Sequence, residues 1–173
     1  RAAPLVALSY HEVTDDIALP ARAGITTEQL VSHFDWLHAR GYQPVSIQEL
    51  IDARAGRSKL PEKPVLLSFD DGYLSFFTHV YPLLQLYHYP AVLALVGSFM
   101  EPGPGELVTY GTEQLERSEF LDWEQVQEMV GSGLVEVASH SYDLHKGILA
   151  NEQGNLLPAA HVYHYDPINQ RYE

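Results

Sequence analysis

Uniformly apolar segments of five or six residues recur along this chain, and they constrain its fold more than any other feature. They lack the alternation of apolar and polar residues that marks a half-exposed strand, so each predicts a strand buried on both faces. Segments with helical periodicity separate them. Two of these begin with a capping box, at Thr26 and at Ser46, and another begins after the N-cap residue Asp122. This alternation predicts an α/β fold with a parallel sheet, either covered on both faces or closed into a barrel. The apolar segments are residues 5–10, 65–69, 91–96 and 134–139.

The length of the chain, 173 residues, favours a single domain over residues 1–173. We expect its core within about residues 5–147, because the pattern of strands and helices decays after that point, and the tail at 148–173 stays unassigned. Residues 101–119 contain Pro-Gly-Pro-Gly and little periodicity, which predicts an exposed insertion.

Charge and composition exclude several classes of function. Ten Lys and Arg residues against 23 Asp and Glu residues leave a net charge of −13, which repels nucleic acid and anionic membranes. The chain has no Cys, so thiolate metal sites and disulfides are excluded. No apolar segment reaches the roughly 18 residues that a transmembrane helix needs, and residues 1–4 show no signal-peptide core. We therefore expect no nucleic-acid partner, and a neutral or cationic partner instead.

Two adjacent carboxylates, Asp70 and Asp71, directly follow the apolar segment 65–69, and Gly72 permits a sharp turn there. Asp-Asp-Gly after a strand is also ordinary turn chemistry. A functional role is the alternative, because catalytic groups of α/β proteins lie where strands end.

Two histidines, His140 and His145, follow another apolar segment at the same expected edge of the sheet. Five residues apart, they would diverge on a helix but can converge in a loop. Two imidazoles and one carboxylate, from Asp70 or Asp71, form a facial triad that holds a divalent ion and leaves positions open. Isolated surface or core histidines are the alternative reading of this pair.

An open metal site activates water and polarises a carbonyl group, which suits hydrolysis of an amide or an ester. The carboxylate that does not bind the ion can then act as a base. His11, which follows the apolar segment 5–10, can act as the acid for the leaving group. The pattern therefore predicts a metal-dependent hydrolase.

The segment 68–72, Ser-Phe-Asp-Asp-Gly, resembles the first motif of the polysaccharide deacetylases, and the segment 140–145, which begins with His140-Ser141, resembles their second. These metal-dependent hydrolases remove N- or O-acetyl groups from sugars. The family usually has its two histidines four residues apart, whereas here they are five apart. With Ser-Tyr-His-Glu-Val at 9–13, this spacing is similar to the branch that deacetylates poly-β-1,6-N-acetyl-D-glucosamine in biofilm export. The likeness runs from about Leu5 to His145.

The resemblance implies a role for each matching residue. Asp70 would be the general base and His11 the general acid, with a metal-bound water as nucleophile. The metal, a divalent Zn, Ni, Co or Fe ion, would be bound by Asp71, His140 and His145. The implied fold is a distorted (β/α) barrel of parallel strands, incomplete in this chain, because nothing after Gly147 resembles the rest of the family domain.

Two aromatic residues next to the motifs, Tyr73 and Tyr142, are expected to stack on sugar rings, with half-buried packing as the alternative. The substrate implied by the resemblance is an N-acetylglucosamine polymer, and another N-acetylated glycan such as chitin or peptidoglycan is the alternative. A saccharide-binding module without activity on the same scaffold is a further alternative, whereas adjacent carboxylates disfavour a glycosidase. The resemblance also implies a periplasmic or outer-membrane location, a C-terminal glycosidase-like domain and export machinery outside this chain.

Overall fold

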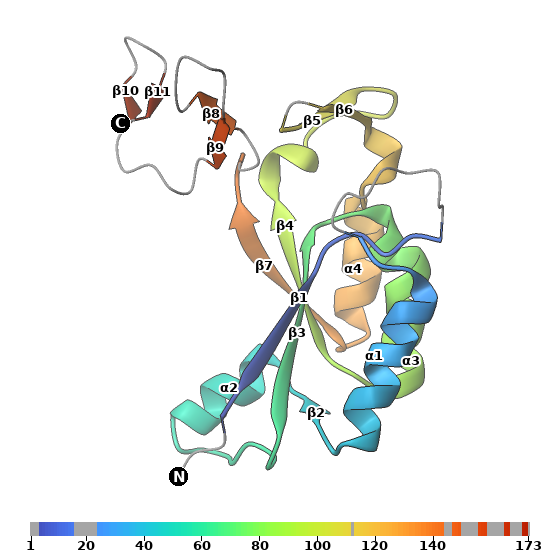
Figure 1. Cartoon of the computed structure of the whole chain (residues 1–173), viewed down its shortest axis with the longest axis vertical. Helices are drawn as coiled ribbons and strands as arrows, with labels where there is room; N and C mark the ends of the chain where they lie inside the picture. Colours follow the sequence, from blue (N-terminus) through green and yellow to red (C-terminus); the bar gives the residue numbers. More distant parts are fainter. Residues whose placement is uncertain are drawn as a thin grey trace.

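The structure is a computed structural model, and it describes residues 4–15, 24–111 and 113–143 together with the backbone of four short strands further on (Figure 1). Those short strands form two antiparallel pairs, β8 (Gly147–Leu149) with β9 (Leu156–Pro158) and β10 (Tyr165–Asp166) with β11 (Arg171–Tyr172).

Parallel strands form the main sheet, in the order β1-β3-β4-β7, as the apolar segments predicted. The register places Tyr10 opposite Phe69, and Asp71 opposite Leu95, so neighbouring strands end at the same edge. The strands are β1 (Val6–Tyr10), β3 (Pro64–Asp71), β4 (Ala91–Val96) and β7 (Val135–Ser141), and β2 (Gln43–Pro44) pairs in parallel with the start of β3.

Among the α-helices of the described residues, three begin with a complete capping box, in which the N-cap side chain and the third helical residue each accept a backbone N–H. The N-cap residues are Thr26, Ser46 and Asp122, and each had been predicted from the sequence. The segment 76–87 is a π-helical turn, 76–80, followed by an α-helix with Pro82 in its first turn. The α-helices are α1 (Thr27–Ala39), α2 (Ile47–Arg54), α3 (Tyr81–Tyr87) and α4 (Trp123–Gly131).

The main hydrophobic core lies between the sheet and the group of helices α1, α3 and α4, which Figure 1 shows along one side of the sheet. Alternate residues of β3, Val65, Leu67 and Phe69, are at most 1% exposed because they face these helices. Ser68 and Asp70 point to the other face, where they are only half-buried. The alternation thus directs Asp70 away from the main core.

The segment 101–119, predicted to be an exposed insertion, is partly ordered into a hairpin of β5 (Leu107–Tyr110) and β6 (Glu113–Glu116). Val108 and Leu115 are 1% and 3% exposed and belong to a second hydrophobic cluster with Phe99 and Phe120. The segment is mostly exposed, as predicted, but it is ordered, because two apolar residues in a polar segment suffice to attach a hairpin when a cluster is already present to receive them.

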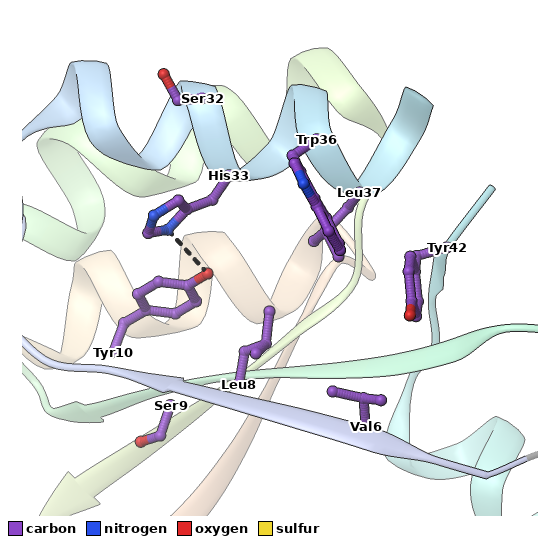
Figure 2. Close-up of a pocket in the computed structure, with 9 residues that line it drawn as sticks. All are labelled: Val6, Leu8, Ser9, Tyr10, Ser32, His33, Trp36, Leu37 and Tyr42. Atoms are coloured by element: carbon purple, nitrogen blue, oxygen red, sulfur yellow. Dashed lines mark hydrogen bonds between the residues drawn. The ribbon is translucent and has the colours of Figure 1, made fainter. Parts of the chain in front are cut away.

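An apolar cavity of about 620 Å³ lies between β1 and α1 (Figure 2). Leu8 and Tyr10 point from the strand toward the helix, and the Tyr10 hydroxyl lies 3.4 Å from Nδ1 of His33. Ser9 points to the opposite side of the strand. The predicted site residues that the structure describes do not line this cavity. Among the helices of the described ranges, none has the length and apolar character that crossing a bilayer would require.

Candidate active site at the carboxyl ends of the strands

The turn that ends β3 is built from two consecutive residues with left-handed backbone conformation. Asp71 has a φ of 75° and Gly72 a φ of 83°. The positive φ favours glycine at position 72, and a Cβ atom there would lie 2.7 Å from Cδ2 of Leu95, which would have to move. An aspartate with positive φ is uncommon, and such backbone strain is concentrated at functional sites. Asp71 is the last residue of β3 and is buried, as the alternation along the strand predicts.

Asp70 is held by two serine hydroxyls from adjacent strands. Ser9 on β1 donates to Oδ2 and Ser68 on β3 donates to Oδ1, each over 2.9 Å. The carboxylate is half-buried, so it keeps contact with solvent. The two serines therefore hold both carboxylate oxygens in place while the carboxylate remains accessible to solvent. A group that takes up and releases protons needs both properties.

Asp71 is fully buried, with 0% of its surface exposed. The Tyr110 hydroxyl donates to its Oδ2 over 3.1 Å, and its Oδ1 lies 3.7 Å from Nε2 of His140. The His140 side chain is 26% exposed. The buried carboxylate thus presents one oxygen to a tyrosine and the other to a histidine that reaches solvent.

The pair formed by Asp71 and His140 fits a divalent ion. Two ligand atoms of a tetrahedral site with bonds of about 2.1 Å are roughly 3.4 Å apart, close to the distance seen between Oδ1 and Nε2. His145, the predicted third ligand, lies outside the described residues. Within the ranges that the structure describes, no three His, Asp or Glu side chains are grouped closely enough to hold an ion. Two of the three predicted ligands are therefore brought together by the fold.

His11 follows the last residue of β1. Tyr10 is paired with Phe69, so His11 leaves the sheet at the level of Asp70 on the neighbouring strand. The side chain is half-buried. The predicted acid and the predicted base thus leave adjacent parallel strands at the same edge.

The two tyrosines predicted to stack on sugar differ in exposure. Tyr73 is 2% exposed and its ring stacks on Phe120, with 5.2 Å between the centroids, so it is not available to a sugar, contrary to the prediction. Tyr142 is 64% exposed, and its hydroxyl donates to Oε2 of Glu101 over 3.0 Å. Its ring passes so close to Gly97 that a Cβ there would meet Cδ2 at 3.0 Å. The use of Tyr142 in stacking stays a prediction.

Burial raises the pKa of the Tyr73 hydroxyl, and a hydrogen bond with Tyr110 raises it further. A hydrogen bond has this effect when the hydroxyl in question is the donor, because the bond then stabilises the protonated form. The negative charges of Asp71 and Glu12 act in the same direction. Tyr73 therefore belongs to the polar surroundings of Asp71 through its hydroxyl, while its ring is part of the second cluster.

Sequence reasoning missed three groups that shape this site. Ser9 and Ser68 are polar residues within apolar strands. Such a residue indicates that its side chain makes a polar contact on one face of the sheet. Tyr110 gave no such signal, because it lies 39 residues from Asp71 in a segment that was predicted only to be an exposed insertion.

The family described as polysaccharide deacetylase matches residues 57–156 of this chain. Poly-β-1,6-N-acetyl-D-glucosamine N-deacetylase of Escherichia coli K12 is 45% identical over 168 residues, which make up 97% of this chain and 25% of that protein. The chain thus spans a quarter of the length of this curated relative.

Two solved structures are also similar. A de-N-acetylase from Aggregatibacter actinomycetemcomitans superposes with a TM-score of 0.86 at 45% identity, over 98% of this chain and 66% of that one. The deacetylase domain of BpsB from Bordetella bronchiseptica superposes with a TM-score of 0.80 at 40% identity, over the same shares of the two chains. The fold class predicted from the sequence, α/β with parallel strands of the deacetylase type, is confirmed.

Proposed function

The chain belongs to the polysaccharide deacetylase family, and from this membership we propose that it carries the active site of a metal-dependent N-deacetylase acting on poly-β-1,6-N-acetyl-D-glucosamine. The names of the similar proteins support the substrate class, since relatives of 45% and 40% identity are described as N-deacetylases or deacetylases. The observation that carries the proposal is the meeting of the buried Asp71 with His140, at 3.7 Å, beside the accessible Asp70.

Asp71 and His140 would hold the divalent ion, together with His145 as the third ligand proposed from the family motif. Their donor atoms, a carboxylate oxygen and an imidazole nitrogen, accept Zn, Co, Ni or Fe. When bound, such an ion lowers the pKa of water and polarises the carbonyl group of the acetamide.

The protons are moved by this chain's own residues. Asp70 takes a proton from the attacking water, and its two serine hydroxyl bonds keep both carboxylate oxygens in place while it does so. His11 then gives a proton to the sugar nitrogen as the bond to the acetyl carbon breaks. The products are acetate and an amino sugar unit. The net charge of −13 suits this chemistry, because the substrate is neutral and the product amine is cationic.

Acetate release from β-1,6-linked N-acetylglucosamine oligomers tests the proposal. We expect the purified protein to release acetate, to lose this activity on treatment with a chelator, and to regain it when Zn²⁺, Co²⁺ or Ni²⁺ is added back. The metal content of the protein before and after chelation should change in parallel with the rate.

Comparison substrates separate the alternatives. Acetate from chitin oligomers or peptidoglycan, with none from the β-1,6-linked oligomer, would assign the chain to another glycan. Binding of the oligomer without acetate release would indicate a saccharide-binding module, and new reducing ends would indicate a glycosidase.

Replacing His11 with glutamine is expected to lower kcat by about 10²-fold to 10⁴-fold, which is the usual contribution of a general acid. Its metal content should stay that of the wild type, because His11 is not proposed to bind the ion. His33→Gln is a matched control, since His33 also lies near β1 but contacts Tyr10 on the helical side of the sheet. Loss of the ion in the His11 variant would instead make this residue a ligand.

The periplasmic or outer-membrane location, the second glycosidase-like domain and the export machinery stay predictions from the resemblance. Fractionation of cells that express the complete protein would test the location.

A further inference from the structure

The β5–β6 hairpin delivers one polar atom to the candidate active site. Tyr110 is the last residue of β5, and its hydroxyl donates to Oδ2 of Asp71 over 3.1 Å. Asp71 itself has no exposed surface, so this contact is made in the interior of the protein. A hydrogen bond from a hydroxyl to a buried carboxylate is short-range and directional, and it is stronger than one in water.

Packing holds the Tyr110 ring in place. The ring lies 5.7 Å from that of Phe99 and 6.1 Å from that of Tyr73, measured between centroids. Val108, two residues earlier on the same strand, is 1% exposed in the same cluster. The hydroxyl is therefore positioned by a packed hairpin and does not depend on a free rotamer.

The proton of Tyr110 is directed at Asp71. A tyrosine hydroxyl has one proton, and that of Tyr110 is donated to Oδ2 of Asp71.

The two oxygens of Asp71 consequently face different partners. Oδ2 is occupied by the tyrosine, and Oδ1 lies toward His140. We propose that Tyr110 is a positioning residue that holds Asp71 as a one-oxygen metal ligand, with Oδ1 turned to the ion. This inference rests on the proposed function, and it assigns to the hairpin a part in building the metal site.

Metal affinity in the full chain tests the role of Tyr110. Tyr110→Phe keeps the packed ring and removes only the hydroxyl, and we expect its Kd for Zn²⁺ to rise by about 10-fold to 100-fold, as when other partners of metal ligands are removed. The Kd is measured by competition with a chromophoric chelator, and the absorption spectrum of the Co²⁺-loaded protein should change because the carboxylate is free to turn. The melting temperature of the metal-free variant shows whether folding is affected.

A matched control removes the same type of bond elsewhere. The Tyr87 hydroxyl donates to Oδ1 of Asp35 over 2.7 Å, between α3 and α1. Tyr87→Phe should leave both the Kd for Zn²⁺ and the Co²⁺ spectrum unchanged. A Tyr110→Phe protein with the wild-type Kd and spectrum would overturn the inference.

A second variant decides the matter if Tyr110→Phe fails to fold. Tyr110→Met also removes the hydroxyl and keeps an apolar side chain in the cluster, so its Kd should rise as for Tyr110→Phe. An unchanged Kd in a folded Tyr110→Met protein would overturn the inference. Failure of the proposed function would look different, since the wild-type protein itself would then bind no ion and release no acetate.

Discussion

Replacing Asp71 with asparagine is expected to abolish acetate release and to remove the bound metal ion. The carboxylate is fully buried, and one of its oxygens lies 3.7 Å from Nε2 of His140. A carboxylate at the surface of the protein therefore cannot take its place as a metal ligand. A catalytic ion contributes several kcal/mol of transition-state stabilisation, so removing it should lower kcat by about 10³-fold or more. Metal analysis of the purified variant and an acetate assay measure the two effects.

The stability of the same variant gives an independent check. A buried carboxylate is costly to desolvate, and asparagine of nearly the same shape still accepts from Tyr110 without carrying a charge. The metal-free variant should therefore unfold at the same temperature as the metal-free wild type or above it. Asp35→Asn is the control, because Asp35 also accepts from a tyrosine hydroxyl but lies on α1. Retention of both metal and activity in Asp71→Asn would exclude Asp71 as a ligand.

Replacing the neighbouring Asp70 with asparagine is expected to lower kcat by about 10²-fold to 10⁴-fold while the protein keeps its metal. Asparagine can still hydrogen-bond to Ser9 and Ser68, whose hydroxyls rotate to suit it, so the geometry of the site should survive. What asparagine cannot do is take a proton from water. The acetate assay and the metal content together measure this separation of function.

The matched control for this variant is Asp52→Asn. Asp52 on α2 is a half-buried carboxylate that also accepts side-chain hydrogen bonds, from Gln48 and Arg57. Its replacement should leave kcat unchanged. If Asp70→Asn instead lost the ion as Asp71→Asn does, the two carboxylates would not have the separate roles proposed for them.

Local features of the chain were sufficient to predict most of the fold. The helices that begin at Thr26, Ser46 and Asp122 were correctly predicted because a capping box involves residues only three positions apart. The strands were correctly predicted because continuous apolar segments have no stable position except inside a covered sheet. Parallel strands then place Asp70, Asp71 and His140 at one edge without further information.

Features that depend on contacts distant in sequence were missed or wrong. The hairpin within the segment 101–119, predicted only as an exposed insertion, was missed because the polar composition conceals the two residues that attach it to the second cluster. Tyr73 was expected to contact a sugar because it lies next to the motif, yet Phe120 covers its ring. In both cases the deciding partners come from other segments of the chain, and no periodicity in the sequence reports on them.

The amino-acid sequence alone therefore determined the α/β architecture and the edge of the sheet where the chemistry is expected, since hydrophobic periodicity and capping are properties of neighbouring residues. Only the tertiary structure decided how the two adjacent carboxylates differ. Asp70 stays accessible between Ser9 and Ser68, whereas Asp71 is buried and lies against Tyr110 and His140. The physical reason is that burial and hydrogen-bond partners arise from packing between segments far apart in the chain, which local sequence patterns do not encode.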